Sequence, residues 1–169
     1  LGAKTGIEVS ESAGTIPDPE WKLENIGEGW ATGDAVNMAI GQGFVQVTPL
    51  QLVTLLAAIA NGGTLYQPSV VDRIGAGAGM PEEALPPHVN GQLPISPYTL
   101  TTLHEAMFDV ANNGSGTATH QFLELPVQVA GKTGTAEDPP RTSHAWFAGY
   151  APAAPYTKPD GTVIENPEI

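Results

Sequence analysis

A five-residue stretch, residues 131–135, constrains the fold of this chain of 169 residues more than any other segment. It reads Gly-Lys-Thr-Gly-Thr and follows the β-type residues 128–130. The turn-rich residues 137–141 come next, and then the largely apolar residues 144–152. Two strands joined by a loop are the simplest structure for this pattern. The sequence therefore predicts a β-hairpin against which the other elements must pack.

The side chains of the first strand point to a binding function. Side chains alternate along a strand, so we expect Thr133 and Thr135 on one face and Lys132 on the other. Gly134 leaves the backbone bare between the two hydroxyl groups. This pattern predicts a strand edge that holds an anionic ligand. The alternative is a lysine on a solvated hairpin that binds no ligand. The Lys-Thr-Gly run alone does not decide between a binding edge and a solvated hairpin.

Lys-Thr-Gly and Gly-Lys-Thr runs also occur in other contexts. A phosphate-binding P-loop needs a glycine at the position where this chain has Pro126, so that interpretation fails. A second Lys-Thr-Gly run occupies residues 4–6 and is followed by Ile7 instead of a hydroxyl residue. Its neighbours predict no hairpin, and we interpret it as a coincidence of composition.

The clearest helix signal begins at residue 48. Thr48 can cap the helix, Pro49 suits the first helical position, and Gln51 completes a capping box. The following residues are apolar around most of the helix, up to the stop signal at residues 61–63. We therefore expect a buried helix over residues 49–60.

The remaining segments are less regular. A second helix is expected to begin at residues 96–97 and to end by residues 112–114. Residues 1–40 look irregular, apart from one or two helical turns over residues 34–40, and residues 75–87 look like a mobile connection within the domain. Three apolar anchors are expected under the first segment: Trp21, Ile26 and Trp30. Together these predictions describe an α+β protein.

Charge and composition exclude several classes of function. Six basic and 18 acidic residues give a formal net charge of −12, which disfavours nucleic acid and anionic membrane surfaces as partners. There is no cysteine, so no disulfide and no thiolate metal site can form. The histidines lack metal-site spacing: His88, His104, His120 and His144. We expect no metal, no cofactor and a structural or solvent-facing role for His144.

The Lys-Thr-Gly-Thr run and its Trp-Phe-Ala-Gly-Tyr partner strand resemble the third active-site motif of penicillin-binding proteins and serine β-lactamases. Residues 41–63 and the Gly-Thr-Ala run at 116–118 are similar to segments of class B penicillin-binding proteins. The resemblance covers most of residues 1–152 and is weakest over 75–95. It implies a partial transpeptidase fold, an antiparallel sheet with flanking helices, incomplete at both ends. Residues 1–169 would form the C-terminal part of that domain, without its final sheet strand.

The resemblance also implies roles for the motif. Lys132 would act in catalysis by polarising the serine machinery, and the Thr133 and Thr135 hydroxyls would bind the substrate carboxylate beside Gly134. The amide N–H of Thr135 would form half of the oxyanion hole. The implied partners are a peptidoglycan stem peptide ending in D-Ala-D-Ala, β-lactam antibiotics and the rest of the transpeptidase domain. The implied location is the extracytoplasmic face of the bacterial cell membrane.

Two motifs of the family do not occur in residues 1–169. No serine or threonine lies three positions before a lysine, as Ser-x-x-Lys requires, and no serine precedes an asparagine by two positions. We therefore expect the nucleophile to lie outside this chain and the chain alone to be inactive. A β-lactamase or β-lactam sensor of the same fold, and a non-catalytic interaction module, remain as alternatives.

Overall fold

The computed structural model describes residues 1–75, 77 and 82–164. The helices are α1 (Pro19–Ile26), α2 (Thr32–Ala39), α3 (Pro49–Ala60), α4 (Pro97–Asn112) and α5 (Thr119–Phe122). The strands are β1 (Thr64–Tyr66), β2 (Arg73–Gly75), β3 (Glu82–Ala84), β4 (Val89–Gln92), β5 (Ala130–Ala136), β6 (His144–Tyr150), β7 (Tyr156–Thr157) and β8 (Val163–Ile164). Within the described residues the strands form four two-stranded antiparallel ladders: β1–β4, β2–β3, β5–β6 and β7–β8. The α+β prediction is confirmed, with short ladders in place of one broad sheet.

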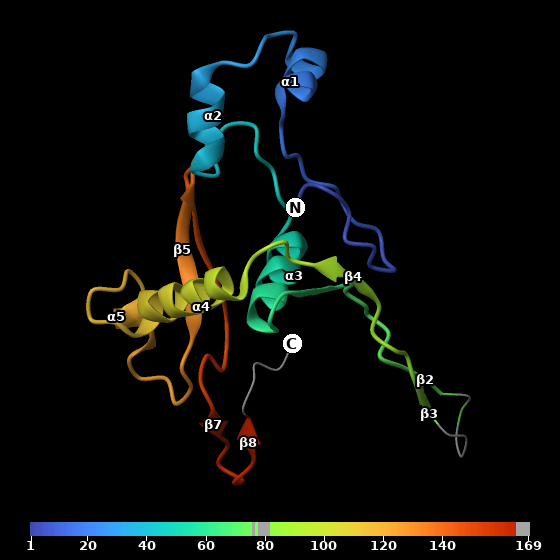
Figure 1. Ribbon diagram of the computed structural model, residues 1–169, viewed down its shortest axis with the longest axis vertical. Coiled ribbons are helices and arrows are strands. Elements are labelled where there is room, and N and C mark those ends of the chain that lie inside the picture. Colours follow the sequence, from blue (N-terminus) through green and yellow to red (C-terminus); the bar gives the residue numbers. More distant parts are fainter. Residues whose placement is uncertain (76, 78–81, 165–169) are drawn as a thin grey trace.

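The predicted hairpin is the longest of these ladders. Strands β5 and β6 pair in unbroken register, with Lys132 opposite Ala148 and Gly134 opposite Trp146. Helix α4 packs against β5, and helix α3 contacts β6 and β1 (Figure 1). The hairpin is therefore supported by both of the helices that the sequence predicted.

A small core joins these elements. Ile59 of α3, Met107 of α4 and Ala130 of β5 are buried together, and Phe108 and Tyr150 pack on them. Burying an aliphatic or aromatic side chain contributes about 1.5–3 kcal/mol, so this cluster fixes the hairpin to the helices. A polar tie lies beside it, because the Asn112 side chain donates a hydrogen bond of 2.8 Å to the Val129 carbonyl.

Helix α3 begins as predicted but is less buried than predicted. Thr48 Oγ1 accepts from the Gln51 amide at 3.2 Å, and the Gln51 side chain accepts from the Thr48 amide at 3.3 Å. Only Gln51, Ala58 and Ile59 of this helix are buried, and Val53 is 62% exposed. The expectation of a helix buried all round was wrong, because no described element covers its outer face.

Helix α4 follows the prediction closely. The Ser96 side chain accepts from the Thr99 amide at 3.1 Å, and Pro97 occupies the first helical position. The Asn113 amide closes the last turn on the Asp109 carbonyl at 3.0 Å. These local signals set both ends of the helix.

The prediction of an irregular N-terminal segment was wrong in part. Asp18 caps helix α1 by accepting from the Trp21 amide at 2.7 Å, and Gly27 ends the helix in the left-handed region with φ of 81°. The Trp21 ring packs on Phe44, with centroids 5.5 Å apart. Ile26 is 44% exposed and is not an anchor. An Asp-Pro start and a glycine stop were present in the sequence, so α1 obeys the same capping rules as α3 and α4.

The connection predicted over residues 75–87 contains regular structure. Strand β3 pairs with β2, and β4 follows and pairs with β1. Of the predicted connection, residues 76 and 78–81 lie outside the described residues, as do the C-terminal residues 165–169. The correction arises because antiparallel pairing can use short polar segments that carry no apolar periodicity.

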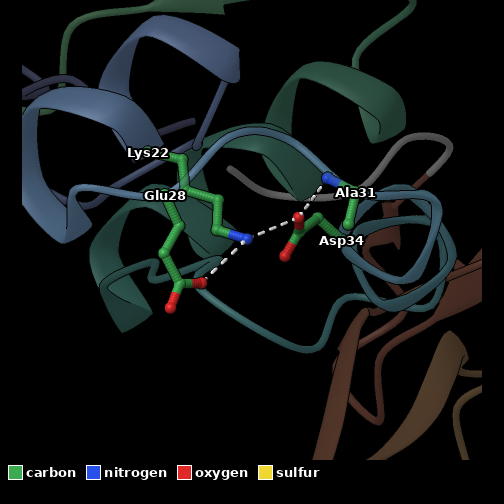
Figure 2. Close-up of polar contacts among 4 residues, drawn as sticks. All are labelled: Lys22, Glu28, Ala31 and Asp34. Carbon is green, nitrogen blue, oxygen red and sulfur yellow. Dashed lines mark hydrogen bonds and ion pairs between the residues drawn. The ribbon is translucent and has the colours of Figure 1, made fainter.

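A buried ion pair ties α1 to α2, which lie together at one end of the molecule (Figure 1). Lys22 is 5% exposed, and its Nζ lies 2.7 Å from Asp34 Oδ2 and 3.7 Å from Glu28 Oε2 (Figure 2). Asp34 also accepts from the Ala31 amide at 2.7 Å at the start of α2. The hydrogen bond from Lys22 lowers the pKa of Asp34, and the reciprocal bond raises the pKa of Lys22.

Asp34→Asn is expected to lower the Tm by a few degrees near pH 7, because it leaves the Lys22 charge buried without its closest partner. Since the folded pKa of Asp34 is depressed, its contribution is complete above the unfolded aspartate pKa of about 3.9 and is lost as pH falls through the folded value. Thermal unfolding near pH 7 and at about pH 2 checks this. Glu28→Gln is the matched control and should have little effect, because Glu28 is exposed and more distant; equal losses for both variants would contradict the assignment.

Candidate functional site

Within the described residues, no strand pairs with the edge of β5 that faces away from β6, and side chains bond to two of its carbonyl groups. Lys132 Nζ donates to the Thr133 carbonyl at 2.6 Å, and Gln42 Nε2 donates to the Thr135 carbonyl at 3.2 Å. Lys132 is itself a residue of β5, whereas Gln42 comes from outside the β5–β6 ladder. In an antiparallel ladder the N–H and C=O of one residue point to the same side, and the side alternates along the strand. The amides of Thr133 and Thr135 therefore also face the open edge.

The predicted site side chains gather beside this edge. Thr133 is half-buried and Thr135 is exposed. The alternation predicts Lys132 on the other face, yet its ammonium reaches back to the Thr133 carbonyl on the open edge. Lys132 also lines a cavity of about 290 Å³ between the end of α4 and the loop that follows it. The structure thus places the Lys132 ammonium at the same strand edge as the outward backbone groups of Thr133 and Thr135.

The two glycines of the motif have different surroundings. A Cβ on Gly131 would overlap Phe147 and lie 2.8 Å from the Ala148 carbonyl oxygen. A Cβ on Gly134 would meet only the Trp146 side chain, at 3.7 Å. Packing therefore requires a glycine at 131 and leaves 134 free, so the bare backbone at Gly134 has no structural cause within the hairpin.

The second Lys-Thr-Gly run is occupied by a carboxylate of the same chain. The Thr5 amide and hydroxyl each lie 2.9 Å from Glu11 Oε2, and the Gly6 amide lies 2.8 Å from Glu11 Oε1. These bonds, led by the one from the Thr5 amide, lower the pKa of Glu11. Residues 4–6 form a closed internal contact, which accords with the interpretation that they are not a site.

The tip of the hairpin is held by side-chain contacts to Asp138. His144 Nε2 lies 3.1 Å from Asp138 Oδ2, and Arg141 Nε lies 3.5 Å from the same oxygen. This contact is compatible with the structural or solvent-facing role predicted for His144, which stays a prediction. Within the described ranges, no group of three histidine, aspartate or glutamate side chains could hold a metal ion. No helix there is long and apolar enough to cross a bilayer.

Two residues at the edge were not predicted as site residues. Gln42 reaches Thr135 across 93 positions of sequence, and the Thr117 hydroxyl lies 2.9 Å from the Thr133 hydroxyl. The family resemblance drew attention to both segments, but only as structural elements. Their proximity to β5 results from tertiary packing that no local pattern encodes.

Comparison with known proteins agrees with this geometry. A family model described as the penicillin binding protein transpeptidase domain matches residues 1–165. The chain is 32% identical over 170 residues to peptidoglycan D,D-transpeptidase MrdA of Haemophilus influenzae, a match that covers 90% of this chain and 26% of that protein. The chain belongs to the penicillin-binding protein transpeptidase family, and its relatives place it in class B.

Solved structures show the same relationship. Penicillin-binding protein 2B from Streptococcus pneumoniae superposes with a TM-score of 0.73 at 29% identity, covering 90% of this chain and 25% of that one. PBP2 of Helicobacter pylori, solved in complex with MreC, gives a TM-score of 0.71 at 32% identity, covering 90% and 27%. The chain spans about a quarter of the length of the relatives it matches. The predicted partial transpeptidase fold is confirmed.

Gly131→Ala is expected to destabilise the protein by about 1–3 kcal/mol, because the added methyl group overlaps the facing strand. Gly134→Ala is the matched control and should change the free energy of unfolding by less than about 0.5 kcal/mol. Denaturant unfolding of the two variants measures both values. Equal destabilisation would show that Gly134 also has a packing role.

Proposed function

We propose that the full-length protein containing this chain is a peptidoglycan D,D-transpeptidase that is acylated by β-lactams. Membership of the transpeptidase family and the names of the relatives support this activity. The observation that carries the proposal is the open edge of β5, where the Lys132 ammonium bonds to the Thr133 carbonyl and the neighbouring Thr135 is exposed. In this proposal residues 1–169 form the C-terminal part of the catalytic domain.

The reaction divides between this chain and the rest of the domain. A serine in the remaining part attacks the penultimate D-alanyl carbonyl of a stem peptide, and the peptide bond to the terminal D-alanine breaks. The serine proton passes through the basic network to the departing amine. The amine of a second stem peptide then attacks the acyl-serine and regenerates the hydroxyl group. Lys132 supplies positive charge at that network, and this charge favours the deprotonated form of the attacking serine.

The strand itself binds and orients the substrate. The hydroxyl groups of Thr133 and Thr135 donate to the terminal carboxylate, and Gly134 lets the peptide approach the backbone between them. The Thr135 amide donates to the oxyanion that forms on the attacked carbonyl. These donors are fixed by the ladder to β6, so the site needs no rearrangement of this strand when charge develops.

The proposed location follows from the substrate. Peptidoglycan is cross-linked outside the cytoplasm, so the full-length protein would act at the extracytoplasmic face of the cell membrane. Its proposed partners are the D-Ala-D-Ala stem peptide, β-lactams and the remainder of its own domain. A β-lactamase would hydrolyse the acyl adduct rapidly, a sensor would retain it, and a non-catalytic interaction module would form none.

Fluorescent penicillin is expected to label the full-length wild-type protein covalently, whereas residues 1–169 alone should remain unlabelled. Lys132→Ala should reduce the rate of labelling by about 100-fold or more, because removing one preorganised electrostatic group from an active site costs at least that much. Gel fluorescence over time measures the rates. Labelling of the isolated chain, or an unchanged rate in the Lys132→Ala variant, would contradict the assigned roles, and no labelling of the wild type would favour the interaction module.

Thr135→Pro is expected to slow acylation of the full-length protein by about 100- to 1000-fold, the usual effect of removing one oxyanion donor. Proline is tolerated at an edge position whose N–H faces outward, so the fold should persist. Thr135→Val keeps the amide and loses only the hydroxyl, and its effect should be clearly smaller. Stopped-flow acylation with parallel Tm values compares the two; an equal effect of both variants would assign the role to the side chain.

A further inference from the structure

Thr117 lies next to the predicted binding strand without belonging to it. This exposed residue of the loop between α4 and β5 has its Oγ1 2.9 Å from Thr133 Oγ1. Thr117 also lines the cavity of about 290 Å³ that Lys132 lines. The two threonine hydroxyl groups therefore form a continuous polar row that starts on the loop and ends on β5.

The loop holds Thr117 firmly in that position. A Cβ on Gly116 would overlap the carbonyl oxygens of Asp109 and Val110, so the loop backbone lies directly against the end of α4. The Ala118 amide donates to the Val110 carbonyl at 3.0 Å, and Ala118 is 3% exposed. Thr117 stands between these two fixed neighbours with its own side chain exposed.

Binding of an anion decides which of the two threonine hydroxyl groups donates in the Thr117–Thr133 hydrogen bond. A carboxylate only accepts hydrogen bonds, so Thr133 must donate its single proton to it. The Thr133 oxygen is then left as an acceptor, and Thr117 is the donor within reach. A hydroxyl that accepts one bond becomes a stronger donor in the next. The cavity is also lined by Asp109, so its net charge does not by itself favour an anion. Selection of an anion then depends on correctly oriented hydrogen-bond donors.

We propose that Thr117 is a positioning residue that makes the site selective for ligands with a free carboxylate, an inference that rests on the proposed function. The Thr117 hydroxyl donates to Thr133, and Thr133 donates to the carboxylate. A neutral ligand at the same place gains less from these two successive hydrogen bonds, because a neutral acceptor forms a weaker hydrogen bond than a carboxylate.

The test compares a penicillin with its methyl ester as acylating agents of the full-length protein. Thr117→Val should slow acylation by the free acid about five- to tenfold, the effect of one hydrogen bond in a charge-assisted row, and should change the rate with the ester little. Thr117→Ser should restore the preference for the acid. Ser115→Ala is the matched control, because Ser115 lines the same cavity but its hydroxyl bonds to Asn113 instead of β5.

The ratio of the two rates decides the outcome. Both probes report on the same folded molecules, so a loss of folded protein lowers both rates and leaves the ratio unchanged. A lower acid-to-ester ratio in Thr117→Val alone supports the inference. An unchanged ratio, or the same decrease in Ser115→Ala, overturns it while the proposed transpeptidase function stands. Absence of acylation of the wild type by either probe contradicts the proposed function and this inference together.

Discussion

The unpaired edge of β5 is the feature on which the proposed chemistry depends. Unpaired strand edges are normally protected, because their N–H and C=O groups pair readily with other chains. Here β6 forms the ladder hydrogen bonds on one side of the strand. Helix α4 packs on β5 and helix α3 packs on β6, which keeps the hairpin in place. On the other side, the Lys132 and Gln42 side chains donate to the carbonyl groups of Thr133 and Thr135. The amides of these two threonines also point outward. The edge is thus kept in place and still able to bind a ligand.

The two Lys-Thr-Gly runs show that position decides the role of a motif. Both present a threonine hydroxyl and backbone amides in a form that suits a carboxylate. At residues 4–6 the carboxylate is that of Glu11, only a few positions away, and the donors are used up. On β5 the ladder holds the chain extended, and in the part of the chain that the structure describes no neighbouring acidic side chain bonds to Thr133 or Thr135. The strand keeps its donors for a ligand from outside.

Local signals predicted much of the fold and little of how its parts meet. The starts of α3 and α4 follow from Thr48, Gln51 and Ser96, because caps act over a few residues. Helix α1 carries the same signals and was overlooked among prolines and glycines. The hairpin followed from two β-type segments joined by a turn, and the roles of Lys132, Thr133, Gly134 and Thr135 followed from a family resemblance. The contacts of Gln42 and Thr117 with β5 could not be predicted, because packing of α4 and of the loop after α2 creates them.

A crystal structure of the full-length protein acylated by a penicillin would test the central claim most directly. The account predicts the ligand carboxylate within hydrogen-bond distance of the Thr133 and Thr135 hydroxyl groups, and the acyl carbonyl oxygen on the Thr135 amide. The bond from Lys132 to the serine network would appear in the same map. A carboxylate bound away from β5, or a Thr135 amide that contacts no ligand atom, would contradict it.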